Sequence, residues 1–148
     1  MYYIIAAHGA YAEGCKSSCE MITGDTSAFV PVTFTEDMTK EDVEKKYEKI
    51  LAEKGVDECK AIIADLPGGT PYNAAMRIVA EHKNIQLVAG LSQQLLVLLN
   101  AGEELADAIA QTGEIYGNTV VVKEKKTVQA PKGPVEKNGI VNFRLDER

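Results

Sequence analysis

Short apolar segments alternate with helical patterns along the first two thirds of the chain. The apolar segments are rich in branched side chains and cover residues 2–7, 28–34, 61–65 and 85–89. Continuous apolar runs of this kind are typical of strands in a parallel sheet that is covered on both faces. The alternation therefore predicts an α/β fold, in which right-handed βαβ units build an open parallel sheet flanked by helices.

The clearest helix lies between the second and third of these segments, at residues 40–54, where apolar positions recur at helical spacing. Thr39 is its predicted N-cap, with Asp42 three residues later in a variant of the capping box. Gly55 suits the C-terminal stop. Further helices are predicted at residues 11–23, from Pro71 onward with Thr70 as the N-cap, at 92–100 and at 103–111.

The last part of the chain changes character. Residues 119–126 hold three consecutive valines followed by charges, which predicts a further strand. Residues 129–137 are rich in proline, lysine and glycine and predict a linker. Residues 139–145 predict one more short strand.

The composition argues against several classes of partner. The 148 residues fit one domain, and a hydrophobic fraction of 45% is enough for a core. The formal net charge of −6 disfavours nucleic acid and anionic membranes as partners. No apolar run approaches the roughly 20 residues that cross a bilayer, and the apolar opening lacks the basic leader of a signal peptide. We therefore expect a cytoplasmic protein.

Three cysteines raise the question of a metal site. Cys15 and Cys19 are four residues apart and share one face of a predicted helix. No second pair of cysteine or histidine residues completes a zinc-type ligand set, because His82 stands alone at a probable helix end. We expect no metal, and we interpret the three thiols, Cys59 included, as reduced structural side chains.

Two polar residues follow predicted strands directly. His8 follows the first strand and precedes Gly9, and Asp65 ends the third strand. The carboxyl ends of parallel strands form the edge where ligands of open α/β sheets bind. If the two strands are neighbours, the carboxylate fixes the histidine tautomer and leaves the other ring nitrogen free as a nucleophile. The alternatives are a histidine satisfied within a loop and an aspartate that caps a helix.

The segment Gly68-Gly69-Thr70-Pro71 predicts an anion site. Its glycines allow close backbone approach, and the following helix directs its free N–H groups to the same place. A glycine pair is common in turns, and this one fits neither a P-loop nor GxGxxG, so nucleotide binding is poorly supported. The chain also lacks GxSxG and HExxH.

Taken together, these segments resemble the IIA component of the mannose-type bacterial phosphotransferase system (mannose, fructose, sorbose, N-acetylgalactosamine and gluconate). The resemblance rests on the strand-then-HG start at residues 4–9, on DLPGGTPYNAA at 65–75 and on VAGLS at 88–92. It covers roughly residues 1–125 in order and spacing. The pattern Asp-x-x-Gly-Gly-[Ser/Thr]-Pro-x-Asn-Ala-Ala is its most specific part.

The resemblance implies a phosphocarrier, a phosphotransferase without a cofactor, for coupled sugar uptake and phosphorylation. His8 would accept the phosphoryl group from phospho-HPr as a tele-phosphohistidine and donate it to a IIB component. Asp65 would orient His8. The phosphoryl oxygens would be received by Gly9, Gly68, Gly69 and Thr70. The membrane would be reached only through IIC and IID components.

The resemblance also implies a sheet of order 2-1-3-4 and a homodimer, in which a C-terminal strand at residues 119–125 crosses antiparallel to the partner. The carrier domain would span residues 1–126. Residues 127–148 form an extension whose NGIVNFRLDER segment is similar to the start of a IIB component. The chain is either cut from a longer IIA-IIB protein or carries a private tail, and we favour the tail.

Three alternatives remain open. The phosphocarrier subunit of a dihydroxyacetone kinase shares the fold and the histidine but lacks this form of the GGTP loop. IIA-like modules also act as phosphorylation switches in transcription regulators. A hydrolase that uses His8 and Asp65 on a small phosphoester would turn over such a substrate, whereas a carrier would not. The sequence does not identify the sugar, because a IIA component meets proteins.

Overall fold

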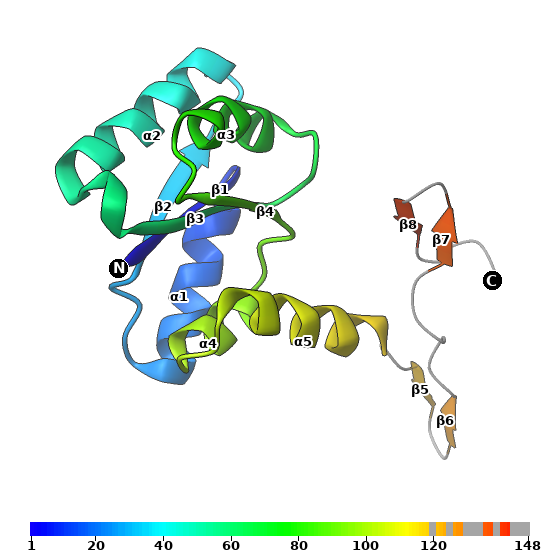
Figure 1. Ribbon diagram of the computed structural model, residues 1–148. Helices are drawn as coiled ribbons and strands as arrows, with labels where there is room; N and C mark the ends of the chain where they lie inside the picture. The colour runs from blue at the N-terminus through cyan, green and yellow to red at the C-terminus, as the bar shows by residue number, and fades with distance from the viewer. Residues whose placement is uncertain (119–120, 124–125, 129–134, 138–139, 143–148) are drawn as a thin grey trace. The chain divides into compact units, whose positions relative to one another are not determined.

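The computed structural model describes residues 1–118, 121–123, 126–128, 135–137 and 140–142. The chain divides into two compact units, Met1–Gly102 and Glu103–Arg148 (Figure 1). None of the helices in these described segments is both long enough and apolar enough to span a membrane.

The first unit is built on a parallel sheet in the order β2-β1-β3-β4. This confirms the predicted sheet and its order. The observed strand boundaries lie within two residues of the apolar segments. The four strands are β1 (Tyr2–His8), β2 (Phe29–Phe34), β3 (Cys59–Ala64) and β4 (Gln86–Ala89).

Helices cover both faces of this sheet, with α2 and α3 on one side and α1 and α4 on the other (Figure 1). A short 3-10 turn, Val56–Glu58, leads into β3. The arrangement agrees with the predicted α/β class. The helices are α1 (Tyr11–Thr23), α2 (Lys40–Lys54), α3 (Thr70–Glu81) and α4 (Gln93–Asn100).

The two central strands form the core between these helix layers. Ile4 and Ile5 on β1 and Ile62 and Ile63 on β3 are all fully buried. Consecutive residues of a strand point to opposite faces, so burial of both neighbours requires cover on each face. The continuous apolar runs of the sequence therefore arise from this three-layer packing.

The helix ends agree with the sequence in two places and differ in one. Thr39 and Asp42 form the predicted capping box of α2, and Gly55 is its C-cap. The predicted N-cap of α3 was wrong, because the cap is Gly69 and Thr70 is already the first helical residue. Gly69 has the extended backbone of a cap residue and no side chain of its own, so the N-cap makes no side-chain hydrogen bond.

The second unit begins with α5 (Leu105–Gly117), which extends beyond the predicted residues 103–111. Its strands are β5 (Val121–Lys123), β6 (Lys126–Val128), β7 (Val135–Lys137) and β8 (Ile140–Asn142). They pair antiparallel as β5 with β6 and β7 with β8.

These hairpins correct two expectations. The stretch predicted as a single strand at residues 119–126 contains β5 and the first residue of β6, and its other residues lie outside the described ones. Part of the predicted linker at 129–137 is β7. An Asn-Gly dipeptide stands in the sequence between β7 and β8, and such dipeptides favour two-residue hairpins.

Candidate functional site

His8 and Asp65 meet at the carboxyl edge of the sheet. His8 is the last residue of β1, Asp65 follows β3, and the two strands are neighbours. Nδ1 of His8 lies 2.7 Å from Oδ2 of Asp65, and the backbone N–H of His8 donates to the same oxygen at 3.0 Å. The other carboxylate oxygen accepts the N–H of Leu66 at 2.9 Å. The structure thus brings together the two residues that the sequence singled out.

The charge of Asp65 fixes the tautomer of His8. Burial acts to raise the pKa of the Asp65 carboxyl, but the hydrogen bonds from His8 and Leu66 and the nearby imidazole outweigh it, so the pKa lies below its usual value. An ionised carboxylate can only accept hydrogen bonds, so Nδ1 of His8 carries the hydrogen. The lone pair of the neutral ring is then on Nε2, on a side chain that is 45% exposed.

Two further residues confine the His8 ring. Phe34, the last residue of β2, meets it edge to face, with ring centroids 5.4 Å apart. On Gly69, a Cβ atom would stand 3.0 Å from Cε1 of His8. Only glycine lets the backbone approach the ring this closely without displacing it.

The glycine loop is held by α3, the helix that it opens. Gly68 has a φ of +80°, which suits glycine, and its carbonyl accepts a bond from Nδ2 of Asn73 at 3.0 Å. The N–H of Gly69 donates to Leu66 O at 3.3 Å. Gly69 therefore contributes space beside His8, and the available donors belong to the first turn of α3.

That first turn combines two kinds of donor. The first N–H groups of α3 have no partner within the helix and point out of its N-terminal end, as in every helix. The positive end of the helix dipole lies at the same place. Pro71 has no N–H, so Thr70 and Tyr72 supply the free amides. The Thr70 side chain adds a hydroxyl group to the same turn. This arrangement suits an oxyanion brought to His8.

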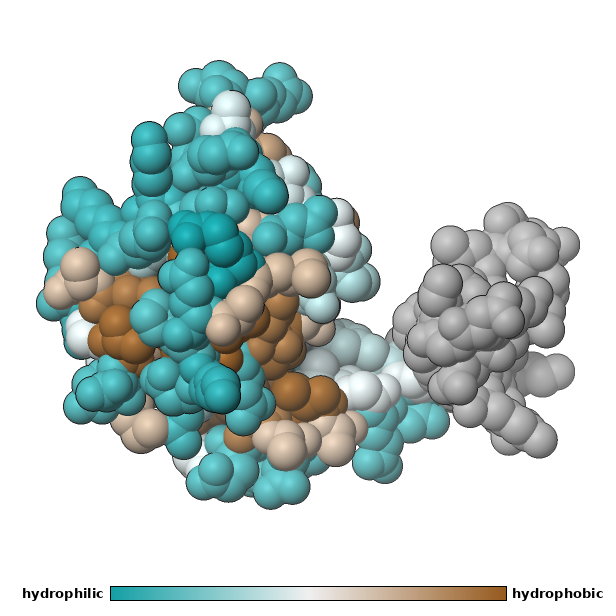
Figure 2. All heavy atoms as spheres, turned by 45° about the horizontal axis from the view of Figure 1, so that its top comes forward, coloured by the Kyte–Doolittle hydropathy of each residue, from teal (hydrophilic) through white to brown (hydrophobic). Residues whose placement is uncertain are grey.

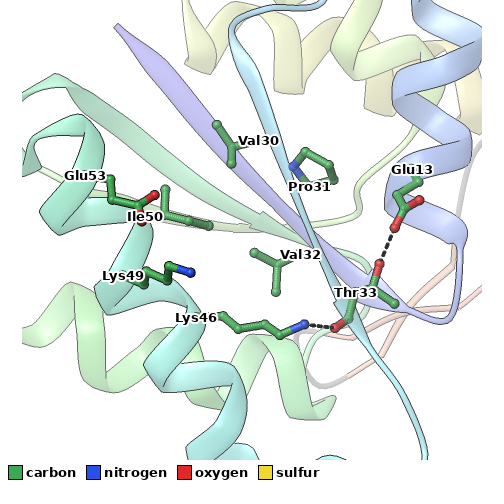
Figure 3. A pocket seen from close by; sticks show the side chains of 9 residues that line it. All are labelled: Glu13, Val30, Pro31, Val32, Thr33, Lys46, Lys49, Ile50 and Glu53. Atoms are coloured by element: carbon green, nitrogen blue, oxygen red, sulfur yellow. Dashed lines mark hydrogen bonds between the residues drawn. The ribbon is translucent and has the colours of Figure 1, made fainter.

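A hollow of about 400 Å³ opens beside the histidine. It is lined by His8, Gly9, Phe34, Thr35 and Glu36. Sequence reasoning missed Phe34, although its position at the end of a strand on the same edge was a usable signal. A second hollow, of about 350 Å³, lies along β2 between α1 and α2 (Figure 3).

The remaining candidate residues lie away from this site. His82 is the half-buried C-cap of α3, as predicted for a helix end. The three cysteines are buried, free thiols, and burial raises the pKa of Cys15 and that of Cys59, the latter to about 11. Within the described residues, no three His, Cys, Asp or Glu side chains gather into a metal site.

Comparisons with known proteins point to one family. The family model described as "EIIA-man: PTS system fructose IIA component" matches residues 2–114. The sorbose-specific EIIA component of Lacticaseibacillus casei is 35% identical over 138 residues, covering 88% of this chain and 96% of the relative. The fructose-specific EIIA component of Bacillus subtilis is 31% identical over 104 residues, covering 70% of this chain and 71% of the relative.

Solved structures agree with these relatives. The mannose/sorbose specific IIA subunit of Enterococcus faecalis has a TM-score of 0.74 at 28% identity and covers 84% of this chain and 98% of its own. A phosphotransferase component EIIA from Streptococcus agalactiae has a TM-score of 0.67 at 27% identity, with 82% and 95% covered. A sigma-54 interaction domain protein from Enterococcus faecalis, at 13% identity and a TM-score of 0.60, shares the fold alone.

Proposed function

The chain belongs to the IIA family of the mannose-type sugar phosphotransferase system, a family of phosphoryl carriers, and from this premise we propose that His8 is the residue that carries the phosphoryl group. The observation that carries the proposal is the 2.7 Å contact between Nδ1 of His8 and the Asp65 carboxylate. It leaves Nε2 as the nucleophile on an exposed ring.

The transfer is a displacement at phosphorus. The Nε2 lone pair of His8 forms a bond to the phosphorus atom of phospho-HPr while the bond from phosphorus to the donor histidine breaks. The Nδ1 proton stays on the ring, hydrogen-bonded to Asp65, so the carboxylate stabilises the positive charge that develops. In the second half of the cycle, the same group passes from Nε2 to a IIB component.

The receiving groups lie at the start of α3. Thr70 offers its N–H and its hydroxyl to the phosphoryl oxygens, and the dipole of α3 favours their negative charge. Gly9, Gly68 and Gly69 keep side chains out of the space that these oxygens need. Phosphoryl transfer depends mainly on positioning and charge stabilisation, and this chain supplies both from its own residues.

The surface around the site suits protein partners. Leu66 directly follows Asp65 in the chain, and its apolar side chain is 57% exposed. Figure 2 shows hydrophobic patches among hydrophilic side chains on one face of the molecule. We assign the surface around His8 and Leu66 to docking of HPr and of the IIB component in turn. Any contact with the membrane would run through IIC and IID components, and the net charge of −6 disfavours nucleic acid.

We also propose that the carrier domain spans residues 1–126 and forms a homodimer. In this dimer, residues 119–125 of each chain would pair as a strand with the sheet of the partner. The support lies in β4, an edge strand of the sheet. Gly90 N–H bonds Ala64 O on β3, so by alternation the backbone groups of Leu87 and Ala89 point outward. An open edge of this kind accepts an antiparallel strand.

Truncation after Gly117 should give monomer or aggregate, and a well-folded dimer by light scattering would refute the exchange.

The test of the carrier is phosphorylation in a purified system. The chain is mixed with phosphoenolpyruvate, enzyme I and HPr, and intact mass is measured. We expect a single added phosphoryl group, stable in base and lost in acid. His8→Ala should abolish the addition, and the matched control His82→Ala should retain it. Undiminished labelling of His8→Ala would refute the assignment.

A further inference from the structure

Tyr47 lies on α2, outside the site described above, yet it contacts the helix that opens at the site. Its side chain is fully buried, and its hydroxyl donates a 2.8 Å hydrogen bond to the carbonyl oxygen of Pro71. Burial, and after it the charge of Asp65, raise the pKa of Tyr47, so the phenol stays protonated and acts as a donor.

Pro71 stands in the first turn of α3, directly after Thr70. Gly69, two residues before Pro71, brings its backbone close to Cε1 of His8. Because Gly69, Thr70 and Pro71 are consecutive, a displacement of the Pro71 carbonyl also displaces the Gly69 backbone beside the His8 ring and the Thr70 donors.

The loop has two distinct anchors. Asn73 ties Gly68 to α3 through its side-chain amide, a bond within one segment of the chain. The Tyr47 hydroxyl ties the same first turn to α2, the neighbouring helix on the same face of the sheet, whose Val43 and Leu51 are buried in the core. Further along α3, Arg77 binds Glu44 of α2 at 2.8 Å, so the two helices stay joined without the hydroxyl.

We propose that Tyr47 is a positioning residue for phosphoryl transfer, whose hydroxyl fixes the first turn of α3 against His8. The inference rests on the proposed function of His8 as the phosphoryl acceptor. Tyr47 does not touch the reacting atoms. It acts through Pro71, and its loss leaves the chemistry in place but lets the Thr70 donors drift from the transferring group.

The chain offers a matched control for this hydroxyl. Tyr2, also buried, donates a 2.9 Å bond to the carbonyl oxygen of Gly55. It begins β1, at the opposite end of the strand from His8. Tyr47→Phe and Tyr2→Phe therefore each remove one tyrosine hydrogen bond to a backbone carbonyl, and only the first of these carbonyls adjoins the site.

The experiment is single-turnover transfer from phospho-HPr over a range of donor concentrations. The amplitude of transfer measures the fraction of chains that are folded and competent. The rate constant at saturating phospho-HPr measures the transfer step on those chains. Tyr47→Phe should lower the saturating rate about 3- to 10-fold, the size expected when one neutral hydrogen bond acts on the transition state. Its half-saturating donor concentration and its amplitude should match wild type, and Tyr2→Phe should keep the wild-type rate.

Three results would overturn the inference. They are a wild-type saturating rate in Tyr47→Phe, an equal slowing in Tyr2→Phe, and a change confined to the half-saturating concentration, which would indicate docking. The proposed function has a separate test. It would be refuted if the wild-type chain itself were not phosphorylated on His8.

Discussion

The hollow beside His8 and the hollow along β2 have similar volumes, about 400 and about 350 Å³. Beside the first, the Asp65 carboxylate, whose side chain is 10% exposed, lies against one nitrogen of the exposed His8 ring. In the second, the polar groups satisfy the strand itself: Thr33 donates to Glu13 at 2.7 Å, and Lys46 donates to the Thr33 carbonyl at 3.4 Å (Figure 3). The two hollows therefore differ in whether a potential nucleophile is held in one orientation, and their volumes do not reveal this difference.

The second hollow lies along β2, which is one edge strand of the sheet, and β4 is the other edge strand. The carbonyl of Ala28 accepts a hydrogen bond from Tyr3 of β1, and that of Phe34 accepts one from Gly9, directly after β1. By alternation, Phe29, Pro31 and Thr33 direct their backbone groups outward. Pro31 has no N–H, the N–H of Phe29 bonds Thr26 O, and Lys46 takes the carbonyl of Thr33. These features protect the β2 edge against strand addition, whereas β4 contains no proline.

The largest expected difference between the two hollows comes from removing a carboxylate. Asp65→Ala should slow transfer from phospho-HPr by about 10²- to 10⁴-fold, the range of a positioned acid–base partner. Asp65→Asn should retain some orientation but lose the charge and select the wrong tautomer in part. The matched control in the β2 hollow, Glu13→Ala, should keep the wild-type rate. Wild-type rates in both Asp65 variants would show that this residue is only a structural cap.

A smaller effect is expected from filling the space beside the ring. Gly69→Ala should slow transfer by about 10- to 100-fold, because the new methyl group displaces His8 from the productive geometry. The backbone of Gly69 has a φ of −74°, which alanine adopts freely, so the fold should persist. Gly14→Ala on α1 is the control, since its Cβ would meet no atom within 4 Å. Single-turnover rates of the two variants test this, and equal rates would contradict the steric account.

The smallest effect on transfer should come from opening the β2 edge. Pro31→Val with Lys46→Ala restores an outward N–H and frees the Thr33 carbonyl, while His8 and Asp65 keep their contacts. We expect an unchanged transfer rate together with concentration-dependent self-association in light scattering. Lys46→Ala alone is the control with the proline still in place. If the double variant keeps the wild-type molar mass at every concentration, Pro31 and Lys46 do not protect this edge.

Much of the fold was accessible from the sequence because burial on both faces leaves a direct pattern. Ile4, Ile5, Ile62 and Ile63 form the continuous apolar runs that only a covered parallel sheet explains. β8 lies within the strand predicted at residues 139–145, whereas β7 was not predicted, because the proline-, lysine- and glycine-rich composition of residues 129–137 is typical of a linker. The N-cap of α3 was misplaced by one residue, since both Gly69 and Thr70 are acceptable cap residues.

The site was only half predictable, for a physical reason. His8 and Asp65 follow strands directly, so parallel topology alone brings them to one edge. The contacts of Phe34 and Tyr47 depend on side-chain packing between elements that are distant in the sequence. Tyr47 has the spacing of an ordinary core residue of α2, and nothing in that spacing distinguishes its hydroxyl bond to Pro71.

The central claim is that Asp65 holds Nδ1 of His8 and so directs phosphorylation to Nε2. The most direct measurement is nitrogen and phosphorus NMR of the ¹⁵N-histidine-labelled chain after phosphorylation by phospho-HPr. We predict a single phosphohistidine, at position 8, with phosphorus bonded to Nε2 and the proton retained on Nδ1. A phosphoryl group on Nδ1 of His8, or on His82, would contradict the account.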